Sequence, residues 1–197
     1  MLTSLMLGFV ISTRFFVVGG VLLAVMLLYL IFRHNYKRFL SFIMYLPLSL
    51  VVLLFAHTKT IQNGYSIIQI FGVQKYILFY HKSKFILPFS FWDLFLFNRW
   101  HTWWGSYAIS FDSQWIFAWP FTAFATGVYA VSAIFKKIQF SEPEKIVLLW
   151  VIAYSLMLSV GYTSTRYFLP LIPFFYILGT VFIVKLIRLV LKYKFNK

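Results

Sequence analysis

The sequence predicts an all-α fold: a multi-pass transmembrane helix bundle of about five spans, with interfacial helices on the outer face. Of its 197 residues, 62 % are apolar and only 11 % are charged, which is more apolar surface than a soluble domain can bury. The apolar residues form long runs. The basic residues behind the net charge of +14 mostly flank those runs, which favours anionic lipid headgroups over nucleic acid as their partners.

Five apolar runs reach or approach the about 20 residues that cross a bilayer. They are Phe15–Phe32, Phe39–Ala56, Trp115–Phe135, Ile146–Tyr162 and Tyr167–Val184. Prolines lie inside these runs or near their ends, where we expect kinks: Pro47, Pro120, Pro170 and Pro173. Ser141 and Glu144 have the spacing of a capping box and predict a helix start just before Ile146.

The first apolar segment, Leu2–Thr13, is too short to cross a bilayer alone, and Arg14 separates it from the next run. It resembles the second half of a helical hairpin. We expect either an interfacial helix here or a chain that is a fragment of something longer.

Basic clusters at 33–38, 136–145 and 185–197 predict the cytoplasmic side of a cell-membrane protein. Residues 1–197 then form a single membrane domain with a cytoplasmic C-terminus, and 57–114 is an extracytoplasmic, Trp-rich interfacial segment. Within it, Ser66–Tyr80 predicts an amphipathic helix on the outer interface, and Phe85–Phe97 predicts a second interfacial helix. The alternative is a pair of short spans or a re-entrant hairpin.

The stretch with most chemical variety runs from Asn98 to Gly105. Six of the seven tryptophans lie in 92–119, which indicates an aromatic belt at the interface or a platform for a sugar ring or a prenyl chain. The candidate residues for such packing are Trp100, His101, Trp103, Trp104 and Tyr167.

Asp93 and Asp112 flank this stretch. Two carboxylates outside the membrane suit an acid–base pair, or a base beside a divalent metal ligand. The alternative is that both are solvated loop residues paired with Arg99 or Lys84. The four histidines are scattered and form no metal-binding pattern, and no cofactor motif is present.

Arg14 and Arg166 each sit beside an apolar run. An arginine at a membrane boundary needs a partner, and its guanidinium suits phosphate. Ordinary snorkelling to the interface is the alternative.

Two stretches resemble GT-C type glycosyltransferases, the class of the protein O-mannosyltransferases and aminoarabinose transferases. The first is Gly8-Phe9-Val10-Ile11-Ser12-Thr13-Arg14, followed by an apolar run and a basic turn. The second is Arg166-Tyr167-Phe168-Leu169-Pro170-Leu171-Ile172-Pro173, which is similar to the Arg-Tyr entry to a late helix. A Trp-rich outer segment ending in Trp119-Pro120 lies between them.

The resemblance implies that an acceptor attacks a sugar carried on a polyprenyl phosphate, with an Asp as base. Arg14 and Arg166 would contact the phosphate, with Arg99 and Lys84 behind them. In the family the catalytic Asp lies in the first outer loop, ahead of the passage similar to Gly8–Arg14. The chain therefore resembles the C-terminal half, and a separate chain is expected to supply the N-terminal catalytic half.

A non-catalytic multi-pass membrane subunit, or a lipid-handling protein, is the alternative from a different class. A transporter fits less well, because the predicted spans carry few ionisable residues and no inverted repeat is visible.

Overall fold

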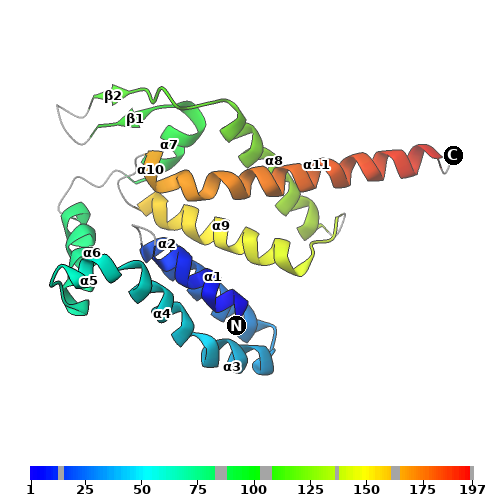
Figure 1. Ribbon diagram of the computed structural model, residues 1–197. Coiled ribbons are helices and arrows are strands. Elements are labelled where there is room, and N and C mark those ends of the chain that lie inside the picture. The colour runs from blue at the N-terminus through cyan, green and yellow to red at the C-terminus, as the bar shows by residue number, and fades with distance from the viewer. Residues whose placement is uncertain (13–15, 83–87, 103–107, 136–137, 161–164, 196–197) are drawn as a thin grey trace. The chain divides into compact units, whose positions relative to one another are not determined.

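The computed structural model describes residues 1–12, 16–82, 88–102, 108–135, 138–160 and 165–195 (Figure 1). The chain divides into two compact units, Met1–Lys84 and Phe85–Lys197. The predicted outer segment 57–114 is therefore divided between the two units. The described secondary structure is helical apart from two strands of two residues each, which confirms the all-α class.

Within the described residues, three helices are long and apolar enough to cross a membrane. They cover Tyr36–Ala56, Glu142–Val160 and Leu169–Leu191. The other two predicted spans form helices of 17 residues, Phe16–Phe32 and Ala118–Ile134. At about 25 Å each, these two fall short of the about 30 Å hydrocarbon layer. The described residues thus support a membrane protein with three helices of spanning length, two fewer than the five predicted spans.

The first unit is built on four helices that pack side by side. They are α1 (Leu2–Ile11), α2 (Phe16–Phe32), α3 (Tyr36–Tyr45) and α4 (Pro47–Ala56). Helix α1 lies against α2 and α4 (Figure 1). Gly8 permits this close approach, since a Cβ atom there would lie 2.7 Å from Cβ of Val52 and 2.9 Å from Cα of Ser49. The short first segment is therefore a packed helix of this unit.

The predicted kink at Pro47 falls within the Tyr36–Ala56 span, where α3 passes into α4 through Leu46. Pro47 is in the first turn of α4, where the missing N–H costs no hydrogen bond. At the other end of α3, the Asn35 side chain caps the helix by accepting from the backbone N–H of Arg38 at 3.3 Å.

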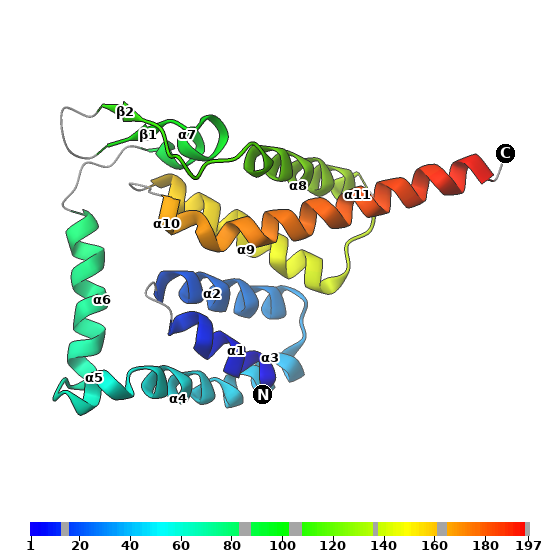
Figure 2. The ribbon, with the colours of Figure 1, turned by 45° about the horizontal axis from the view of Figure 1, so that its top comes forward.

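After the short helix α5 (Thr58–Gln62), helix α6 (Ile67–Lys82) runs across the direction of α4 (Figure 2). Among its described side chains Ile70 is buried, and Phe71 makes an edge-to-face contact with Phe16 of α2 at 5.8 Å. The helix agrees with the predicted Ser66–Tyr80 segment. Its apolar and polar residues are spread around the helix, however, so the predicted amphipathic character is weak.

The second unit consists of three long helices closed at one end by a small cap. The long helices are α8 (Ala118–Ile134), α9 (Glu142–Val160) and α11 (Ile172–Phe195). Helix α10 (Thr165–Phe168) and the 3₁₀ turn η1 (Leu169–Leu171) lead into α11. The cap comprises α7 (Ser90–Phe97), β1 (Trp100–His101) and β2 (Ile109–Ser110).

Helices α8 and α11 make the most extensive pairing in this unit (Figure 1). A Cβ atom on Gly179 would lie 3.3 Å from the carbonyl oxygen of Thr122, so glycine allows the two backbones to come close. The Thr126 hydroxyl donates across the same interface to the carbonyl of Phe175 at 3.3 Å.

Aromatic rings fill the space beneath the cap. Phe91, Phe95 and Phe168 are fully buried. Ring centroids lie 5.4 Å apart for Phe95–Phe168 and 5.3 Å apart for Trp119–Phe168, both edge-to-face. This cluster joins α7 to α8 and α10 and fixes the cap on the ends of the long helices.

Candidate functional site

The cap brings the two predicted carboxylates, Asp93 and Asp112, into one structure. Helix α7 ends at Phe97, and the left-handed backbone of the next residue, Asn98 (φ 54°, ψ 34°), turns the chain into β1. Asparagine tolerates this conformation better than most residues. Strand β1 then pairs antiparallel with β2, with Trp100 opposite Ser110 and His101 opposite Ile109.

Asp93 and His101 form a dyad on this cap. His101 Nε2 lies 3.2 Å from Oδ2 of Asp93, and their side chains are 24 % and 47 % exposed, respectively. A backbone hydrogen bond of 3.1 Å from Arg99 N–H to the Asp93 carbonyl holds the turn between the two residues. The backbone turn thus fixes the positions of Asp93 and His101, and both side chains remain partly exposed to the surroundings of the protein.

Asp112 is engaged in a different way. Its Oδ1 accepts from the backbone N–H of Gln114 at 2.8 Å, and its Oδ2 accepts from the hydroxyl of Thr165 at the start of α10. Its backbone is held by the Asn98 side chain, which donates to the carbonyl at 3.2 Å and accepts from the N–H at 2.8 Å. Asp112 therefore joins three segments of the unit.

The cap is also bonded to the end of α9 through Ser159. Trp92 Nε1 donates to the Ser159 hydroxyl at 2.7 Å, and Phe89 N–H donates to its carbonyl at 2.8 Å. Phe89 has φ of 65°, which is costly for an aromatic residue. These contacts hold the start of α7 against α9.

The structure places the other predicted site residues unevenly. Trp100 is half-buried on β1, and Arg99 is exposed. Tyr167 is buried, and its carbonyl accepts from the Tyr154 hydroxyl at 2.8 Å, which favours a packing role within the unit. Four predicted site residues lie outside the described residues: Arg14, Lys84, Trp103 and Trp104. The side chain of Arg166 is also outside the described part of the structure.

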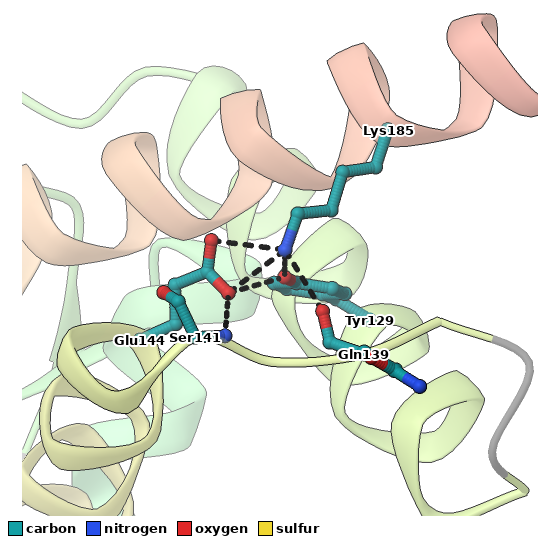
Figure 3. A network of polar contacts seen from close by, with 5 residues as sticks. All are labelled: Tyr129, Gln139, Ser141, Glu144 and Lys185. Carbon is teal, nitrogen blue, oxygen red and sulfur yellow. Dashed lines mark hydrogen bonds and ion pairs between the residues drawn. The ribbon is translucent and has the colours of Figure 1, made fainter.

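A polar cluster at the opposite end of the second unit was not predicted as a site (Figure 3). Lys185 Nζ of α11 donates to Oε1 and Oε2 of Glu144 at 3.0 and 2.8 Å, to the Tyr129 hydroxyl at 2.6 Å and to the Gln139 carbonyl at 3.0 Å. Glu144 also accepts from Tyr129 at 2.9 Å and from the Ser141 N–H at 2.7 Å. The cluster joins α8, α9 and α11.

One contact of this cluster could be predicted from the sequence, because Ser141 and Glu144 have capping-box spacing. The hydrogen bond from the Ser141 N–H to Glu144 confirms it. Lys185 follows 41 residues after Glu144. No local pattern links residues this far apart.

The cap can support acid–base chemistry. A carboxylate that orients an imidazole lets the ring take a proton from a hydroxyl group. Within the described part of the chain, no group of three or more His, Asp or Glu side chains is placed to hold a metal ion.

Compared with protein-family models, curated proteins and solved structures, the chain gives no match. The fold and the geometry of the cap are therefore the observations that bear on its function.

Proposed function

We propose that the chain is a membrane glycosyltransferase, or one part of a split enzyme, that acts on a polyprenyl-phosphate sugar at the outer face of the cell membrane. The observation that carries the proposal is the Asp93–His101 dyad, 3.2 Å apart and partly exposed on the cap. It lies in the Trp-rich stretch, where a lipid-linked sugar would meet the protein.

In the proposed reaction, Asp93 orients His101 through Nε2, and the ring's other nitrogen takes the proton from an acceptor hydroxyl. The acceptor oxygen forms a bond to the anomeric carbon of the sugar. The bond from that carbon to the phosphate oxygen breaks, and the polyprenyl phosphate leaves with the electron pair. The dyad then acts as general base in the manner of a carboxylate–histidine pair.

Asp93 is a better candidate than Asp112 because of what surrounds each carboxylate. Both oxygens of Asp112 accept hydrogen bonds within the unit. The Asp93 side chain is 47 % exposed and has His101 as its partner. Asp112 therefore serves the architecture of the cap, while Asp93 remains accessible to an acceptor.

The phosphate of the donor would be held by basic residues near the cap. Arg166 directly follows Thr165, whose hydroxyl is bonded to Asp112, so its backbone lies beside the cap. Arg99, exposed after α7, is a second candidate on this unit. Arg14 and Lys84 lie outside the described residues and stay candidates for phosphate contact from the sequence alone.

The proposal includes the predicted topology, with five spans and a cytoplasmic C-terminus. Helices α2 and α8 would cross as short spans, by local thinning of the bilayer. The Glu144–Lys185 end of the second unit would then face the cytoplasm, and the cap would face outward. Helix α6, running across the direction of α4 in its own unit (Figure 2), would lie on the outer interface.

A non-catalytic lipid-handling subunit is the second candidate, because the cap and the segment that joins it to α8 also expose large aromatic rings. Phe97 is 63 % exposed, and Phe111 and Phe117 are each 71 % exposed. Rings displayed in this way suit insertion at a membrane interface, and they need no chemistry at Asp93.

The two candidates separate in an assay with the purified chain, a panel of polyprenyl-phosphate sugars and membrane extracts as acceptor. We expect Asp93→Asn to lower transfer by about 10²- to 10⁴-fold with donor binding retained. Glu142→Gln is the control, because Glu142 lies at the other end of α9 and pairs with Lys145 at 2.8 Å. A wild-type chain that binds no polyprenyl-phosphate sugar would remove the glycosyltransferase proposal. Donor binding without transfer, unchanged by Asp93→Asn, would favour the lipid-handling subunit.

A further inference from the structure

Helix α11 is longer than the helices beside it. It has 24 residues, against 17 in α8 and 19 in α9, or about 36 Å against about 25 and 28 Å. Lys185 lies at the level where α8 ends and α9 begins. Its ammonium group donates to the carbonyl of Gln139, in the connection between these two helices, and to Glu144 in the first turn of α9. Beyond it, the α11 extension (residues 186–195) projects from the unit (Figures 1 and 2).

Among the described residues of the second unit, no other element covers the first part of this extension. Six consecutive residues are exposed, which is more than one full turn, so every side of the helix is open. They are Leu186, Ile187, Arg188, Leu189, Val190 and Leu191. Five of the six are large apolar side chains, with exposed fractions of 45–59 %. Water is an unfavourable surrounding for such a helix, and lipid is a favourable one.

The extension also has an excess of positive charge that the chain does not balance. No Asp or Glu follows Glu144 in the sequence, while Arg188, Lys192, Lys194 and Lys197 do. The chain's four acidic residues have partners elsewhere. Asp93 contacts His101, Asp112 contacts Thr165, Glu142 contacts Lys145 and Glu144 contacts Lys185. The acidic side chains of the chain are thus engaged elsewhere, and an anion from outside the chain can pair with the cations of the extension.

We propose that the α11 extension, with the basic residues at its end, is a binding site for acidic phospholipids. Its apolar side chains lie among the acyl chains, and its cations contact the headgroup phosphates, for which arginine is well suited. A single partner helix would cover one face, whereas lipid covers all sides of an exposed turn. This site is separate from the cap and does not depend on the function proposed for it.

The test uses the full purified chain in a neutral detergent, titrated with phosphatidylglycerol or phosphatidylcholine and analysed by native mass spectrometry. The variant Arg188→Gln/Lys192→Gln/Lys194→Gln removes three cations of the extension. The matched control, Lys59→Gln/Lys75→Gln/Lys82→Gln, removes the same charge from the other unit. Both must elute as folded protein.

We expect the wild-type chain to prefer phosphatidylglycerol, and the extension variant to lose about fivefold of this preference for each cation removed. The control variant should keep the preference. Equal losses in both variants would mean that the preference follows net charge alone, and the proposal would be wrong. It would also be overturned by a wild type without preference, or by an extension variant that changes only the oligomeric state, which would indicate a helix–helix interface.

Discussion

The Glu144–Lys185 cluster makes a quantitative prediction for Lys185→Met. The substitution keeps a long apolar side chain but removes the ammonium group, which lies 2.8 Å from Glu144 and 2.6 Å from the Tyr129 hydroxyl. Side-chain exposure is 29 % for Lys185 and 16 % for Glu144. Breaking a fully buried pair from one side costs about 3–5 kcal/mol, and an exposed pair contributes about 0–1 kcal/mol. We therefore expect a loss of about 2–3 kcal/mol in the free energy of unfolding.

The measurement is equilibrium unfolding of the detergent-solubilised chain, monitored by circular dichroism. Arg188→Met is the matched control, because Arg188 is exposed on the same helix and should change stability by about 0.5 kcal/mol or less. Adding Glu144→Gln to Lys185→Met should recover part of the loss, since no carboxylate is then left without its cation. Equal effects of Lys185→Met and Arg188→Met would refute the reasoning.

Two further predictions use the same assay. Gly8→Ala should destabilise the chain by about 1–3 kcal/mol, because the new Cβ would lie 2.7 Å from Cβ of Val52, while Gly20→Ala, with nothing within 4 Å, should be neutral or slightly stabilising. Phe95→Ala should cost about 3–5 kcal/mol, because Phe95 is fully buried, whereas Phe97→Ala on the same helix should cost about 1 kcal/mol or less, because Phe97 is 63 % exposed. Similar losses within either pair would contradict the packing described.

Much of the helical organisation could be predicted from local patterns. Long apolar runs indicated where most of the long helices lie, and Pro47 indicated the passage from α3 to α4. Fewer described helices reach spanning length than the five predicted spans, since α2 and α8 have 17 residues each. The length of an apolar run in the sequence does not show how many residues of that run belong to the turns at its ends and not to the helix.

The candidate site was predictable in its residues but not in its pairings. Asp93 and His101 were both candidates, yet their contact depends on the left-handed turn at Asn98, which local pattern did not indicate. The bond between Asp112 and Thr165 spans 53 positions, and chemical type alone could not select Thr165 as the partner. Tertiary packing decides both contacts.

The order in which the chain is made has a consequence for the second unit. The partners of Asp112, Thr126 and Glu144 on α10 and α11 all lie at or after Thr165. At about 5–20 residues per second, the ribosome needs about 2–8 seconds to pass from Glu144 to Lys185. Glu144 is without Lys185 for that whole interval, and Asp112 is without Thr165 for about its first half. A membrane insertase or chaperone that shields α8 and α9 until α11 arrives would act in that period.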